Sequence, residues 1–443
     1  MKVRKLPKDP GTTGWNAILP LQARYPELET PQTCDTLIIG AGFAGLAAAR
    51  RIQQLDPGSK TVIVEARQVA QGPAGRNTGF MIDLPHDLAS ADYGGNQQHD
   101  LNQITFNRAG IAFADEAAID YGMSPEAFSK SGKINAAASA RGLQQNSDYA
   151  SHLAALNEAH DFLDQQEMKL LTGSDYYRGG LYTPGTAMIQ PALFVRNMAQ
   201  GLSRHASIYE NSPIISLNKH GDAWQASTAR ATINANTVIL TVNGHLESFG
   251  YLKRRLMHVF TYASMTRALT TDEKRILGGE PQWACTPADP MGTTVRRISG
   301  TGGDRIIIRN RFTYDPGMEV SGRRIRNISH EHQRVFTNRF PSLKKVNMEY
   351  QWGGRLCLSR NNVPAFGELE TGLFSACCQN GLGVAKGTTS GKLVAELAYE
   401  HQSDILENML QQETPGKLPP EPFTWIGANA VMRWGEFRAG TEL

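Results

Sequence analysis

Cysteine is scarce in this chain. The 443 residues include five cysteines, an odd number at irregular spacing, which is not the pattern of a disulfide-bonded secreted domain. No Cys/His cluster has the spacing of a zinc site, so we expect no bound metal. Cys377 and Cys378 are adjacent in an apolar run, where buried strand residues are a simpler interpretation than a redox pair. The cysteines therefore favour a reducing compartment, and we expect a cytoplasmic protein.

Charge of one sign and long apolar segments are also missing. The 45 basic residues nearly balance the 42 acidic ones, and without a long basic run we expect no nucleic-acid partner. The basic N-terminus lacks the apolar segment of a signal peptide. The longest uncharged stretch near it, Thr36 to Ala49, has 14 residues, which is too short to cross a bilayer. We therefore expect no membrane span; the oligomeric state stays open.

Glycines, in contrast, follow an informative spacing in residues 34–50, "CDTLIIGAGFAGLAAAR". An apolar strand ends at Gly40, which permits a tight turn. Gly42 lets a pyrophosphate approach the backbone, and Gly45 lets the following helix pack closely against the strand. The helix, which begins near Phe43 and Ala44, offers free N–H groups to the phosphates. The pattern predicts a dinucleotide-binding loop, although a glycine-rich turn of another α/β protein stays possible on this motif alone.

A second strand strengthens this prediction. The residues "TVIV" at 61–64 are followed by Glu65, 25 residues past Gly40. A carboxylate at this distance is typical of the residue that binds the ribose hydroxyls of the dinucleotide. A solvated strand end is the alternative interpretation of Glu65.

The order of segments predicts an α/β (α+β composite) fold with interleaved domains. A nucleotide-binding element opens the chain, helical and strand-rich segments follow, and a second glycine-rich strand–loop–helix closes it. We expect a Rossmann-like cofactor domain and a substrate domain built on an antiparallel sheet. The predicted boundaries are an N-terminal arm at 1–33, a discontinuous cofactor domain at 34–100, 190–250 and 345–400, a substrate domain at 101–189 and 251–344, and a C-terminal extension at 401–443.

Three further segments carry a family resemblance: "GPAGRNTGFM" at 72–81, "WGGRLCLSRNNVPAFG" at 352–367 and "CCQNGLGVAKGTTSG" at 377–391. Together with the first glycine loop, they resemble the FAD-dependent amine and amino-acid oxidases of the D-amino-acid oxidase superfamily. Within it, the γ-glutamylputrescine oxidase branch and its glycine and sarcosine oxidase relatives are most similar. The resemblance spans roughly residues 15 to 400, and four ordered segments are far more specific than one loop.

The resemblance implies an FAD site with roles for residues along the whole chain. It assigns cofactor contacts to the residues that follow Glu65 in the ribose segment and to the segment that passes under the flavin. It also assigns them to the position whose backbone holds the adenine and to the end of the strand that returns beneath FAD. It also implies that a C-terminal turn places N–H groups beside the flavin, where they stabilise the negative charge of the reduced ring. The implied residues are Ala66, Arg67; Gly75, Arg76, Asn77, Thr78; Ile214; Asn243, Gly244; and Gly381, Leu382, Gly383, Val384.

The resemblance also implies the mode of binding and the substrate contacts. Cys357 lies about two positions from the cysteine that holds flavin covalently in sarcosine oxidases, so we expect non-covalent FAD. Arg355 is the candidate for binding a substrate carboxylate, since a guanidinium pairs with two oxygens, with a surface arginine as the equal alternative. His258 and Tyr262 lie in a segment expected to reach the substrate wall, although a packed histidine is the simpler interpretation of His258.

The implied activity is oxidation of the CH–NH bond of a small amine or amino acid to an imine, by hydride transfer to flavin, with dioxygen as acceptor. Such chemistry depends mainly on the cofactor and on positioning, so no catalytic triad is expected. The alternatives are a dehydrogenase that passes electrons to a quinone or carrier, a non-catalytic FAD-binding subunit, and a nicotinamide enzyme that shares only the first loop.

Overall fold

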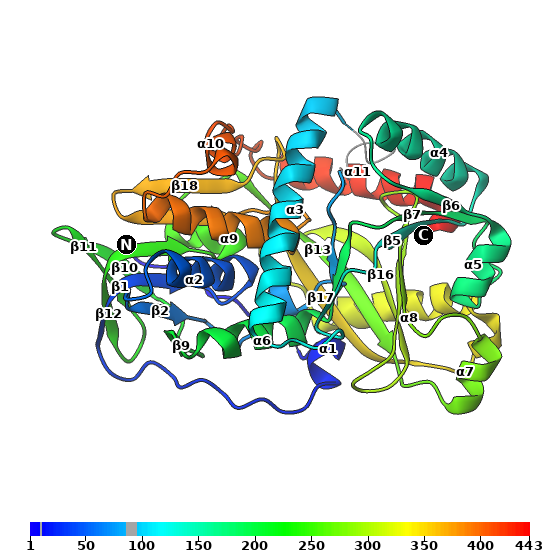
Figure 1. Ribbon diagram of the computed structural model, residues 1–443, viewed down its shortest axis with the longest axis horizontal. Coiled ribbons are helices and arrows are strands. Elements are labelled where there is room, and N and C mark those ends of the chain that lie inside the picture. Colours follow the sequence, from blue (N-terminus) through cyan, green and yellow to red (C-terminus); the bar gives the residue numbers. More distant parts are fainter. Residues whose placement is uncertain (9–10, 86–94) are drawn as a thin grey trace.

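A computed structural model describes residues 1–8, 11–85 and 95–443 of the chain. Two large sheets lie beside each other, and the helices cover their outer faces (Figure 1). Both sheets collect strands from distant parts of the sequence, so the chain passes between them several times.

The first sheet has a parallel centre. Strands β9, β2, β1, β12 and β19 run parallel in that order, while β10, β11 and β18 add antiparallel edges. The bounds are β1 (Gln32–Ile39), β2 (Thr61–Val64), β9 (Ala206–Tyr209), β10 (Ser216–His220), β11 (Ala223–Ser227), β12 (Thr232–Leu240), β18 (Ala365–Glu370) and β19 (Leu373–Cys377).

Both faces of this sheet are buried, which explains why its central strands are continuous apolar runs. Ile38 of β1 packs with the helices of one face, whereas Leu37 and Ile39 pack with the β10–β11 hairpin side. The small residues of α2 let it pack closely on α9 (Figure 1). The helices on or near this sheet are α2 (Phe43–Leu55), α3 (Gln97–Asp120), α6 (Pro191–Leu202), α9 (Ala385–Ala398) and α10 (Asp404–Leu410).

The second sheet is antiparallel except where β14 pairs with β5, and its strand order is β17-β13-β16-β15-β14-β5-β7-β6. Its strands are β5 (Lys133–Ala137), β6 (Asp161–Leu163), β7 (Gly179–Thr183), β13 (Leu256–Thr266), β14 (Trp283–Pro287), β15 (Thr294–Ile298), β16 (Arg305–Tyr314) and β17 (Met348–Ser359). A small third sheet contains β3 (Phe80–Met81), β4 (Phe128–Ser129) and β8 (Ala187–Ile189).

Helix α8 (Gly322–Arg339) covers one face of the second sheet, where Phe260 and Tyr262 of β13 pack against Ile325 and Ile328. In the middle of the second sheet, the opposite face lies toward the first sheet. The remaining helices are α1 (Gly14–Ala17), α4 (Ala140–Ala155), α5 (Gln165–Thr172), α7 (Thr271–Leu277) and α11 (Phe423–Ala439).

The predicted fold class is confirmed: a parallel-centred sheet and a largely antiparallel sheet are interleaved along the chain. The exact domain boundaries stay a prediction. One segment that we placed with the cofactor domain, β17, pairs along its length with β13 in the second sheet. Among the described residues, no helix is both long enough and apolar enough to span a membrane.

Candidate functional site

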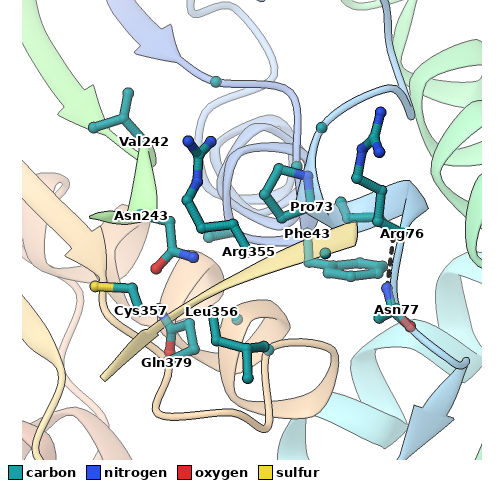
Figure 2. Close-up of a pocket in the computed structure, with 18 of the residues that line it drawn as sticks. Phe43, Pro73, Arg76, Asn77, Val242, Asn243, Arg355, Leu356, Cys357 and Gln379 are labelled. Carbon is teal, nitrogen blue, oxygen red and sulfur yellow. Dashed lines mark hydrogen bonds between the residues drawn. The ribbon is translucent and has the colours of Figure 1, made fainter. Parts of the chain in front are cut away.

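A deep cleft lies between the two sheets, and the predicted segments meet in it (Figure 2). Its wall comes from the carboxyl ends of β1, β2 and β12, the loop after β2, residues 354–357 of β17 and the turn before α9. Ligands of open α/β sheets bind at this edge of the sheet. The predicted residues that line the cleft are Gly40, Gly42, Phe43, Ala44, Glu65, Ala66, Arg76, Asn77, Thr78, Ile214, Asn243, Tyr262, Arg355, Gly381, Leu382, Gly383 and Val384.

The glycine loop has the geometry that its spacing predicts. Gly40 has φ of 109°, which strongly favours glycine. A Cβ on Gly45 would come within 1.9 Å of the Gly40 carbonyl oxygen, so α2 can approach the strand only with glycine there. A Cβ on Gly42, in contrast, would have the Ala74 Cβ at 3.7 Å as its one neighbour, leaving this position open toward the cleft.

Helix α2 begins at this loop without a side-chain cap, because Gly42 occupies the N-cap position. The N–H groups of a first helical turn have no partner inside the helix, so here they are left to a ligand. Glu65 holds the loop in place: its carboxylate accepts hydrogen bonds from the backbone nitrogens of Ala41 and Arg67, each at 3.0 Å.

The segment predicted to pass under the flavin is held rigidly. The Arg76 guanidinium donates to the carbonyl oxygens of Gln71 at 2.7 Å and Gly11 at 2.6 Å. The Asn77 side-chain oxygen accepts from the Gly79 nitrogen at 2.8 Å. Arg76 is therefore a framework residue that fixes the loop with its side chain, while the same loop lines the cleft.

The turn before α9 combines unusual backbone conformations. Cys378, Asn380 and Gly381 all have positive φ, at 57°, 49° and 87°, and such conformations persist only where the surroundings hold them. The Asn243 side-chain oxygen accepts from the Cys378 nitrogen at 3.1 Å, which joins this turn to the end of β12. Helix α9 also begins without a side-chain cap. Two uncapped helix N-termini, those of α2 and α9, thus open into one cleft.

Gln379 is a cleft residue that our sequence analysis missed. Its side-chain oxygen accepts from Ser390 Oγ at 3.0 Å, but its buried Nε2 has no hydrogen-bond partner within the described residues. An unsatisfied buried donor costs free energy, and here it lies in the cleft wall beside Asn243 and Leu356 (Figure 2). Its position immediately before the glycine turn was the available signal.

Cys357 also lies at the cleft, but its thiol is poorly suited to bond formation. A hydrogen bond with Cys378, together with burial, holds the pKa of the Cys357 thiol well above its usual range. Because the thiolate is the nucleophilic form, this environment keeps the thiol inert.

Two arginines of the second sheet line the cleft, but they lie on opposite faces of that sheet, because Arg355 pairs with Phe260 of β13 whereas Arg309 pairs with Ala263, three positions further along. Arg355 on β17 lies between Val242 and Pro73 in Figure 2, and its Nη1 donates to the Met318 carbonyl oxygen at 3.1 Å. Arg309 on β16, which we did not predict, pairs with Ala263 of β13 and Thr294 of β15, both of which line the cleft. No spacing rule could have indicated Arg309, because its place depends on strand register across the sheet.

The other two predicted substrate residues are engaged elsewhere. His258 lies outside the cleft, with Nε2 3.1 Å from a Glu247 carboxylate oxygen. The Tyr262 ring packs under α8, and its hydroxyl lies 2.7 Å from Thr313 Oγ1. His258 is thus kept from the cleft, whereas Tyr262 belongs to the cleft lining although its hydroxyl is engaged, and the catalytic roles of both residues stay predictions.

Four of the residues implied to hold the cofactor also lie outside the cleft lining: Gly45, Arg67, Gly75 and Gly244. Two of these, like Gly45 above, are sites of close packing. A Cβ on Gly75 would meet the Ala70 carbonyl oxygen at 1.9 Å, and a Cβ on Gly244 would meet His258 Nδ1 at 2.8 Å. Their glycines are explained by chain packing, so a direct contact with a ligand is not needed to account for them.

Comparison with known proteins points to an FAD-dependent family, which agrees with a dinucleotide-binding cleft. The model of the FAD dependent oxidoreductase family (DAO) matches residues 35–397. The probable oxidoreductase OrdL of Rhizobium meliloti (strain 1021) is 24% identical over 426 residues, which cover 93% of this chain and 94% of that protein. Gamma-glutamylputrescine oxidoreductase of Escherichia coli (strain K12) is 24% identical over 417 residues, which cover 92% and 94%.

Solved structures share the fold at low identity. Glycine oxidase from Geobacillus kaustophilus superposes with a TM-score of 0.69 at 16% identity, covering 88% of this chain and 100% of that chain. L-Amino acid deaminase from Proteus myxofaciens gives 0.66 at 14% identity, covering 87% and 94%. Since the family model matches most of the sequence, the resemblance is confirmed: the chain belongs to the DAO family of FAD-dependent oxidoreductases.

Proposed function

We propose that this FAD-dependent oxidoreductase oxidises the CH–NH bond of a small amine or amino acid to an imine, with dioxygen as the electron acceptor. The observation that carries the proposal is the convergence of two uncapped helix N-termini, α2 and α9, on one cleft. The second sheet closes that cleft with arginine and threonine side chains. The names of the relatives, an amine-acting oxidoreductase among them, support the same substrate class.

The residues of the cleft fit FAD. The N-terminus of α2 would bind the pyrophosphate, since free N–H groups and the helix dipole favour anions. Glu65, at the end of β2, would accept from the ribose hydroxyls. At the other end, the N-terminus of α9 and the unpaired Gln379 Nε2 would donate to the polar edge of the flavin.

When bound, FAD supplies the two-electron acceptor for a hydride leaving the substrate carbon. The chain's own residues position the substrate and exclude water from the cleft. Arg355 would hold a substrate carboxylate, and the Gly381–Gly383 turn would stabilise negative charge through its N–H groups, as an oxyanion site does. The fixed loop at Arg76 and Asn77 keeps the floor of the cleft rigid, which serves the orientation on which such reactions depend.

Glu65→Ala is expected to weaken FAD binding. A lost hydrogen bond to a charged group costs about 1.5–3 kcal/mol, so the Kd should rise roughly 10-fold or more. Titration of apoprotein with FAD measures this. Glu65→Gln keeps one acceptor oxygen and should lose less, whereas Glu29→Ala, an exposed carboxylate of the N-terminal arm, should change nothing. An unchanged Kd for Glu65→Ala would remove Glu65 from the site.

We expect the flavin to be bound non-covalently. The inert, protonated state of the Cys357 thiol supports this expectation. Acid precipitation of the yellow protein should therefore leave the flavin in the supernatant. Colour that stays in the pellet of the native protein, and is released from Cys357→Ser, would show attachment through that cysteine and contradict the proposal.

The electron acceptor separates this proposal from its nearest alternative. Oxidation with dioxygen produces one hydrogen peroxide for each imine formed, whereas a dehydrogenase reduces an added quinone or carrier and forms little peroxide. A non-catalytic FAD-binding subunit would form neither product, although the glycine turn before α9 argues against it, because a scaffold needs no stabilisation of reduced flavin. A nicotinamide enzyme would lack the flavin absorbance altogether.

A further inference from the structure

Part of the N-terminal arm lines the cleft, although the match to the family model begins only at residue 35. Val3, Lys5, Leu6 and Pro7 all belong to the cleft lining. The first residues of a domain are poorly ordered unless contacts tie them down, so the contacts of this segment indicate its role. Family membership assigns none to it.

The segment is attached to both sides of the cleft. The Arg4 nitrogen donates to the Ser248 carbonyl oxygen at 3.0 Å, in the turn that follows β12 of the first sheet. The neighbouring Lys5 Nζ donates to the carbonyl oxygen of Gly317, in the loop that follows β16 of the second sheet. Two successive residues of the arm thus join the two sheets across the cleft that lies between them.

The side chains of the segment divide between the cleft and the solvent. Arg4 is exposed, whereas Val3 is buried in one hydrophobic cluster with Ile214 and Phe249, and Leu6 packs against that cluster. Ile214 and Phe249 line the cleft as well. Since Ile214 is the position expected to hold the adenine, these apolar side chains lie at the end of the cleft where we expect the adenosine of FAD.

Lys5 adds positive charge to this apolar cover. It is half-buried at the cleft, and no carboxylate in residues 1–8, 11–85 and 95–443 lies within ion-pair distance of its ammonium. The pyrophosphate of FAD is anionic, so an ammonium group without such a partner in the cleft wall favours the bound cofactor. A partly exposed contact of this kind contributes modestly and weakens with added salt.

We propose that residues 3–7 form a strap over bound FAD, in which Val3 and Leu6 cover the adenosine and Lys5 attracts the pyrophosphate. The inference rests on the FAD placement proposed above and gives the arm a role in holding the cofactor. Because the strap joins both sides of the cleft, it must detach before FAD leaves, as a lid does. The strap therefore slows the dissociation of FAD.

The rate at which FAD dissociates from the full chain tests the strap. Val3→Ser/Leu6→Ser should raise this rate at least about tenfold, because two apolar side chains no longer cover the cofactor. Recovery of flavin fluorescence after dilution of the FAD-loaded protein measures the rate. Lys5→Gln keeps a donor for the Gly317 carbonyl oxygen but removes the charge, and it should raise the rate about two- to fivefold at low salt and less at high salt.

Two substitutions in the same arm are matched controls, Leu21→Ser for the apolar pair and Lys8→Gln for the charge. Both residues are exposed and lie outside the cleft lining, so the dissociation rate should stay as in the native protein. Trypsin gives an independent measurement, because it can cleave after Lys2, Arg4 and Lys5 only when the strap is detached. Cleavage at these sites should be roughly tenfold slower with FAD bound than in the apoprotein.

Native rates of FAD release from both Val3→Ser/Leu6→Ser and Lys5→Gln, or equal cleavage of the strap with and without FAD, would overturn the proposal. A native chain that binds no FAD would overturn the FAD placement itself. If Val3→Ser/Leu6→Ser does not fold, Lys5→Gln and the trypsin comparison decide the outcome.

Discussion

Flavin reduction by the substrate is expected to accelerate about tenfold per pH unit until the pKa of the bound amine is reached, because only the neutral amine can release a hydride. Two titratable residues of the cleft could obscure this dependence of the reduction rate on pH, but their pKa values lie outside the neutral range. Burial, and then the charge of Arg355, lower the pKa of His245 to about 3, and burial raises the pKa of Tyr262. Neither group changes charge in the neutral range, so the slope of the reduction rate against pH reflects the deprotonation of the substrate amine.

Anaerobic stopped-flow measurement of flavin bleaching across this range checks the prediction. Repeating the series with two amines of different pKa is the control, since the inflection should move with the substrate. A flat profile, or an inflection that stays at one pH for both amines, would show that deprotonation of the substrate does not limit reduction.

Arg355→Ala is expected to raise the KM for the true substrate about tenfold or more, because one charged hydrogen-bonding contact to a carboxylate is lost. Arg355→Lys should already lose much of the affinity, since a lysine cannot form two parallel bonds. Arg355 is buried, at 6% exposure of the residue, and its Nη1 donates to the Met318 carbonyl oxygen. Steady-state kinetics, with FAD content measured for each variant, test this.

Arg309→Ala and Arg360→Ala complete the experiment. Arg309 reaches the same cleft from β16, whereas Arg360 is an exposed arginine just past β17. Arg360→Ala should behave as the native enzyme. An unchanged KM for Arg355→Ala combined with a raised KM for Arg309→Ala would move carboxylate binding to Arg309, and unchanged values for both would reject a carboxylate-bearing substrate.

The parts of the site that the sequence predicted are those whose chemistry is local. The turn at Gly40, the close approach at Gly45 and the carboxylate at Glu65 depend on neighbours a few residues away or at a fixed separation. The structure places Gly40 and Glu65 in the cleft and gives Gly45 its packing role. The interleaved fold followed from segment order, which is also a property of the chain alone.

The substrate side could not be predicted in the same way, because it depends on register between distant strands. Opposite residues of β13 and β17 share a face, so Arg355 lies beside Phe260, and Tyr262 beside Gly353 under α8. Arg309 owes its place in the cleft lining to the pairing of β16 with β13, which shifts register at a bulge near Thr261. The exposure of apolar side chains on α11, such as Val431 and Phe437, also escaped prediction, because an apolar residue looks the same in sequence whether it is buried or exposed.

An anaerobic screen of amines and amino acids against the purified yellow protein tests the central claim most directly. The account predicts that at least one amine or amino acid bleaches the visible flavin absorbance stoichiometrically and yields the carbonyl product of imine hydrolysis. Bleaching by an alcohol or hydroxy acid while every amine leaves the flavin oxidised would contradict it.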